Sequence, residues 1–83
     1  MSEYHFMVGR GRIPDEARAK QIDRIAREHG ASFTAVDLPG DGPRYWFSCP
    51  NRGAPFDGAV SAAVRKALEA AGFDPSNLKG GAR

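Results

Sequence analysis

Arg44-Tyr45-Trp46-Phe47-Ser48-Cys49-Pro50 is the stretch that decides how this chain of 83 residues is interpreted. It contains the only tryptophan and the only cysteine of the chain. The turn signal Pro39-Gly40-Asp41-Gly42-Pro43 precedes it, and Pro50 ends it because proline cannot donate a hydrogen bond to a neighbouring strand, so a β-strand is predicted. Successive side chains of a strand point to opposite faces, so at least one of the three adjacent aromatic rings must lie on the outer face of a sheet.

Residues 4–8 and 32–38 predict two further strands. In residues 4–8 one face carries Tyr4, Phe6 and Val8, and the other carries His5 and Met7. In residues 32–38 apolar side chains fall on both faces, which either a bulge or burial of both faces would explain. Gly9-Arg10-Gly11-Arg12 is expected to form a flexible connection from the first strand to a helix.

Two amphipathic patterns predict helices over residues 14–29 and 55–71. Pro14 suits the first helical position, because the amide hydrogen that proline lacks has no partner there. Gly30 and Gly72 follow the two patterns directly and are expected to terminate the helices.

The predicted elements follow the order β-α-β-β-α. With a right-handed crossover, the third strand lies between the first two and gives a three-stranded antiparallel sheet of order 1-3-2, with both helices on one face. The expected fold is therefore a two-layer α+β sandwich, equivalent to a ferredoxin-like unit without its last strand. Residues 1–78 are expected to form a single domain and residues 79–83 a flexible tail. One sheet face and one sheet edge stay uncovered, and both can take a partner.

Composition excludes several classes of protein. Twelve basic residues, nine of them arginine, oppose ten acidic residues, a near balance unlike that of an obligate nucleic-acid-binding protein. The single cysteine excludes an internal disulfide, and no stretch approaches the roughly 20 apolar residues of a membrane span, so a cytoplasmic location in a host cell is expected. Two histidines without clustered cysteines or carboxylates predict no metal site, and no cofactor is expected.

The aromatic strand supplies the main candidate site. If Tyr45, Phe47 and Cys49 face the helices, Arg44 and Trp46 face outward. The neighbours expected on the outward face are His5, Met7, Ser32, Thr34 and Ser48. Such a surface suits single-stranded nucleic acid, whose bases stack on aromatic rings, or a protein partner, because tryptophan and arginine are frequent hot spots of protein interfaces. Trp46 would otherwise simply cover the sheet or lie in a homodimer contact.

Further arginines extend this candidate surface. Arg10 and Arg12 lie in the glycine-rich connection, and Arg52 follows the aromatic strand. The predicted partner-binding set is therefore Arg44, Trp46, Arg10, Arg12, Arg52 and His5. The connection over residues 9–12 has amides that can cradle an anion, but it lacks the third glycine of a dinucleotide-binding motif and the lysine of a P-loop, so a plain surface loop is favoured. Cys49 fits no known catalytic spacing, and a non-enzymatic protein is predicted.

A compact domain of 83 residues, built as one β-α-β-β-α unit with no catalytic motif and a glycine-rich tail, resembles the small phage-encoded anti-CRISPR proteins that inhibit type I surveillance complexes. The resemblance covers the whole chain in size and layout, and it carries over no individual residue. Many members are strongly acidic and resemble DNA in charge, whereas this chain is not acidic.

The resemblance implies a non-enzymatic inhibitor that binds a CRISPR effector complex and blocks its binding to target DNA, by covering a protein surface or by occluding a nucleic-acid channel. Two alternatives stay open. One is a small nucleic-acid-binding or regulatory protein that uses the aromatic and arginine side chains of the sheet face. The other is a structural homodimer.

Overall fold

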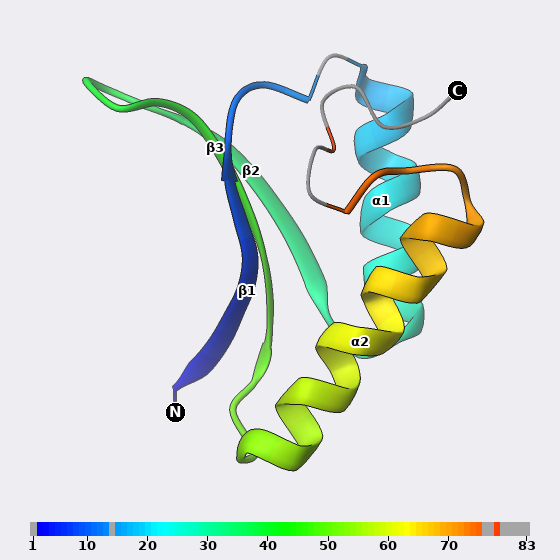
Figure 1. The fold of residues 1–83 in the computed structure, drawn as a ribbon. Coiled ribbons are helices and arrows are strands. Elements are labelled where there is room, and N and C mark those ends of the chain that lie inside the picture. Colours follow the sequence, from blue (N-terminus) through cyan, green and yellow to red (C-terminus); the bar gives the residue numbers. More distant parts are fainter. Residues whose placement is uncertain (1, 14, 76–77, 79–83) are drawn as a thin grey trace.

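The computed structural model describes residues 2–13, 15–75 and 78, and its elements follow the predicted order. They are β1 (Glu3–Arg10), α1 (Glu16–Glu28), β2 (Ser32–Leu38), β3 (Gly42–Pro50) and α2 (Ala54–Ala70). Strand β3 lies between β1 and β2 and is antiparallel to both, and both helices cover the same face of this sheet (Figure 1). The predicted α+β sandwich of order 1-3-2 is confirmed. The predicted tail, residues 79–83, lies outside the described residues.

The bounds of helix α1 are determined by a polar cap at its start and by a glycine after its end. Asp15 is the N-cap, and its Oδ1 accepts the amide hydrogen of Ala17 at 2.8 Å. Helix α1 therefore begins at Glu16, later than predicted, and residue 14 lies outside the described residues. Gly30 has a φ of 82°, and the next residue, Ala31, donates its amide hydrogen back to the carbonyl of Ala26 at 2.9 Å.

Helix α2 ends in the same manner. Gly72 has a φ of 91° and donates its amide hydrogen to the carbonyl of Glu69 at 3.0 Å, while Phe73 donates to Leu68 at 2.9 Å. This pair of bonds is a Schellman motif, and it folds the buried ring of Phe73 back against the core. Neither described helix is long and apolar enough to cross a lipid bilayer.

The core lies between the sheet and the helices and is centred on β3. Phe47 is fully buried and packs between Phe6, at a ring-centroid distance of 5.6 Å, and Phe33, at 5.0 Å. Tyr45 and Cys49 are also buried, which confirms the predicted inward face of this strand. The other side chains of this core are Ile22, Ala26, Ala31, Val64, Leu68, Phe73 and Leu78.

Strand β2 pairs with β3 without interruption from Ser32 to Leu38. Its irregular apolar pattern is therefore not a bulge. Phe33 packs against the core, whereas the side chains at Val36 and Leu38 stay on the opposite face, where Val36 is half-buried.

The pairing of β1 with β3 contains one irregularity. Phe6 lies opposite Phe47 but Gly9 lies opposite Tyr45, so three residue steps along β1 span two steps along β3. Met7 has a φ of 49°, a left-handed conformation that costs a non-glycine residue about 1–2 kcal/mol. Residues 7 and 8 therefore form a β-bulge in β1.

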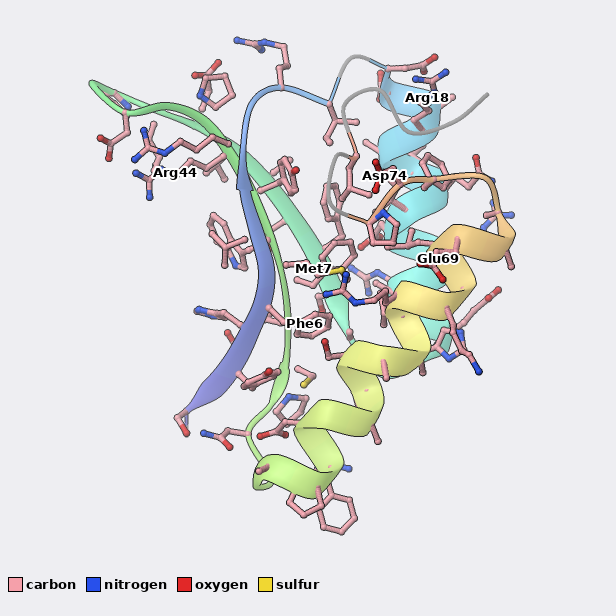
Figure 2. The ribbon with its side chains drawn as sticks, in the orientation of Figure 1. Phe6, Met7, Arg18, Arg44, Glu69 and Asp74 are labelled. Atoms are coloured by element: carbon pink, nitrogen blue, oxygen red, sulfur yellow. The ribbon has the colours of Figure 1, made fainter. Side chains whose placement is uncertain are left out.

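The bulge changes the faces of residues 7 and 8. Met7 packs against the core, between the sheet and the helices (Figure 2), and Val8 is 63% exposed. The prediction that Val8 faces inward and Met7 outward is wrong, because strict alternation holds only while the register is unbroken.

Strand β1 also runs further than predicted. Gly9 and Arg10 belong to the strand, and Gly11 donates its amide hydrogen to the carbonyl of Pro43 at 2.9 Å. The segment over residues 9–11 is therefore held to the sheet rather than forming a flexible loop, and the Gly11 amide is already occupied.

Substitution of Gly9 by alanine tests the close approach that the bulge creates. A Cβ atom at Gly9 would lie 2.3 Å from Cζ of Tyr45, and that ring is buried and packed against Phe33. We expect Gly9→Ala to lower the free energy of unfolding by about 1–3 kcal/mol, measured by urea denaturation. Gly58→Ala in α2 is the matched control, because its Cβ meets open space, and it should raise stability by about 0.5–1 kcal/mol. Equal stability of Gly9→Ala and the wild type would contradict this account.

Candidate partner-binding face of the sheet

The face of the sheet that points away from both helices is the candidate site, and we call it the open face (Figure 1). Strand register and the bulge determine which side chains it carries. They are Glu3, His5, Val8 and Arg10 from β1, Arg44, Trp46 and Ser48 from β3, and Ser32, Thr34, Val36 and Leu38 from β2. The open face therefore combines aromatic, cationic and hydroxyl side chains from all three strands.

An aromatic pair occupies the middle of the open face. Trp46 is half-buried and lies opposite Thr34, and its ring centroid is 6.2 Å from that of His5, with the ring planes tilted by 50°. His5 is more than half exposed, and its Nε2 lies 3.6 Å from a carboxylate oxygen of Glu3. The prediction that Trp46 faces away from the helices agrees with this arrangement, because its neighbours Tyr45 and Phe47 are both buried on the other side.

Two arginines lie directly opposite each other beside the aromatic pair. Arg10 of β1 pairs in register with Arg44 of β3. The side chain of Arg44 extends from the β2–β3 hairpin on the side away from the helices (Figure 2), and its Nη2 lies 3.8 Å from Oδ2 of Asp41. Like charges directly opposite on one sheet face destabilise a strand pair. This end of the open face is therefore cationic.

Arg12 and Arg52 lie away from the open face. Arg12 forms an ion pair with Asp37 beside a hollow of about 350 Å³, which is also lined by Asp15 and Glu16 near the start of α1 and by part of Arg44. Arg52 lies beyond the opposite end of β3, where its amide hydrogen bonds to Oδ1 of Asp57 at 3.0 Å. Of the six predicted partner-binding residues, the structure therefore brings together four: His5, Arg10, Arg44 and Trp46.

A second hollow, of about 290 Å³, lies where β3 ends, between α1 and α2. It is lined by His29, Cys49, Arg52, Phe56 and Asp57, among others. Burial raises the pKa of the Cys49 thiol, the charge of Asp57 raises it further, and Arg52 opposes both effects. A thiol with a raised pKa is a poor nucleophile near neutral pH.

Among residues 2–13, 15–75 and 78, no group of three or more His, Cys, Asp and Glu side chains is arranged to hold a metal ion. The open face, by contrast, carries an aromatic pair and two facing arginines.

No known relative guides this assignment. The chain matches no protein-family model, no curated protein and no solved structure. The functional argument therefore rests on the geometry of the open face.

Val8 is the residue of the open face that the sequence pattern placed wrongly. Gly9 was the available signal, because a glycine inside a strand often marks a bulge or a close approach of another group. Gly9 and Gly11 together are equally typical of a loop, so the alternation over residues 4–8 predicts no bulge.

Proposed function

We propose that this protein is a non-enzymatic binding protein whose open face takes single-stranded nucleic acid. The observation that carries the proposal is the uncovered aromatic pair, Trp46 beside His5, in the middle of a sheet whose other face is covered by helices. Aromatic rings on an open antiparallel sheet are a recurrent platform for unpaired bases, because every base has a flat face that can stack.

The rest of the open face is compatible with this ligand. Arg10 and Arg44 supply positive charge on one side of Trp46, and Ser32 and Thr34 of β2 supply hydroxyl groups on the same face. Hydroxyl groups both donate and accept hydrogen bonds, as the edges of bases require. The net charge of the whole chain is only +2, so we expect modest affinity that weakens as salt is added.

Trp46 gives a direct readout, because it is the only tryptophan of the chain. We expect its fluorescence to be quenched on titration with a 12-residue thymidine or uridine oligonucleotide at low salt. Trp46→Ala should weaken binding about 5- to 150-fold, the effect of losing one stacked base, measured by anisotropy of a labelled oligonucleotide.

Phe56→Ala is the matched control, because this ring is also exposed but belongs to α2 rather than to the sheet. It should bind the oligonucleotide as tightly as the wild type. Unchanged Trp46 fluorescence together with unchanged anisotropy at low salt would rule out the proposed ligand.

A protein partner is the second candidate function, and the exposure of Val8 favours it. Val8, in the bulge, lies on the same face as Trp46 and leaves apolar surface beside the tryptophan, which is a residue type enriched among interface hot spots. In this alternative, we propose that the protein inhibits a CRISPR effector complex, as the size and layout of the chain suggest.

A reconstituted type I surveillance complex tests this second candidate. If the open face is the inhibitory surface, we expect micromolar or tighter binding by the wild type. Trp46→Ala should weaken it about 30-fold or more, because alanine at a hot spot costs about 2 kcal/mol or more, and Val8→Ser should weaken it less. Absence of binding to several type I complexes would exclude this partner. A dimeric mass in light scattering that Trp46→Glu converts to a monomer would instead identify a homodimer.

A further inference from the structure

Arg10 and Arg44 face each other as cross-strand partners on the open face, and no carboxylate of the described residues lies between them as a shared counter-charge. Among the described residues, no carboxylate lies within ion-pair distance of Arg10, and the one that approaches Arg44 is Asp41, at 3.8 Å on an exposed hairpin. The carboxylates of the neighbouring segments are engaged elsewhere, since Glu3 lies next to His5 and Asp37 pairs with Arg12.

The polar atoms of Arg44 also include one without a partner. Its Nε is buried and makes no hydrogen bond within the described part of the chain, although about 30% of the side chain is exposed. A guanidinium group presents its donors as a rigid fork that fits two oxygens of a phosphate or carboxylate. Within the described part of the chain, part of the donor capacity of Arg44 is therefore unused.

The bulge is what brings Arg10 to this position. If the register at Phe6 and Phe47 continued unbroken, Gly9 would lie opposite Arg44, and Arg10 would lie opposite Pro43 on the face of the helices. The extra residue at Met7 moves Arg10 to the open face beside Arg44. A left-handed methionine and a repulsive arginine pair both oppose folding, and strained positions of this kind gather at functional sites.

We infer that Arg10 and Arg44 form a phosphate-binding pair, and that it holds a backbone phosphate of the strand whose base stacks on Trp46. This inference rests on the proposed function and adds the orientation of the bound strand on the open face. The phosphate lies at the end of the open face near the β2–β3 hairpin, and the base lies next to it over Trp46. An anion between two guanidinium groups removes their repulsion and accepts charge-assisted hydrogen bonds from them, so its binding is favoured by both effects.

Salt dependence separates phosphate contacts from base contacts. Each phosphate contact to a single strand contributes a slope of about −0.7 to log K against log salt concentration. We expect Arg10→Gln and Arg44→Gln each to reduce the magnitude of this slope by up to about 0.7 with thymidine 12-mers, and to weaken binding at low salt. Arg12→Gln is the matched control, because Arg12 is paired with Asp37 and should leave the slope unchanged. Trp46→Ala should lower the affinity and keep the slope.

An abasic strand of equal length gives a second readout. Its backbone should bind the wild type with the same slope, and Arg10→Gln should weaken that binding whereas Trp46→Ala should not. The inference would be overturned if Arg10→Gln and Arg44→Gln changed neither the salt slope nor the affinity for the abasic strand. That result would leave base stacking on Trp46 intact.

Failure of the proposed function is distinguishable from failure of this inference. If the wild type binds no strand, pyrophosphate is titrated instead and the Nε–Hε signals of the arginines are followed by NMR. A saturable chemical-shift change at Arg44 that Arg10→Gln abolishes supports the anion site alone. Absence of any chemical-shift change at Arg44 overturns the anion site. Both variants should fold, and without ligand they should melt about 1–5 °C higher than the wild type because the like-charge contact is gone.

Discussion

The contact of the Tyr45 ring with Gly9 is the constraint on which the arrangement of this sheet depends. The ring occupies the space where any other residue would place its Cβ atom, and it is held there by burial and by Phe33. Gly9 must therefore lie opposite Tyr45, and the chain accommodates the extra residue by turning Met7 into a left-handed conformation. One aromatic contact in the core thereby sets the register of the outer half of β1.

That register determines the chemistry of the open face. Phe6 and Met7 both pack inward, and every later residue of β1 is displaced by one position relative to β3. Val8 and Arg10 consequently join Trp46 and Arg44 on the same surface. The helices cover the other face, so the residues that stabilise the fold and those available to a ligand are separated by the sheet itself. A binding surface can be built in this way without a deep pocket.

Much of this fold follows from the sequence, because its strongest patterns are local. The turn before β3, the alternation in β3 and the glycines after both helices are each short-range signals, and the structure contains all three. The turn is shorter than predicted, because Gly42 and Pro43 already pair with β2 as part of β3. The inward side chains Tyr45, Phe47 and Cys49 follow from alternation alone. The bulge does not, because it depends on a contact between Gly9 and Tyr45, which are far apart in sequence. Which face of the sheet Val8 and Arg10 lie on could therefore only be assigned from the structure.

The register of β1 past the bulge is the central claim, and proton–proton distances measured by NMR test it most directly. The structure predicts nuclear Overhauser effects from the Val8 methyl groups to the indole ring of Trp46, and from the Gly9 α-protons to the ring of Tyr45. Effects from the Val8 methyl groups to Tyr45 or to the core residue Ile22 would show an unbroken register, and they would contradict both the bulge and the open face built on it.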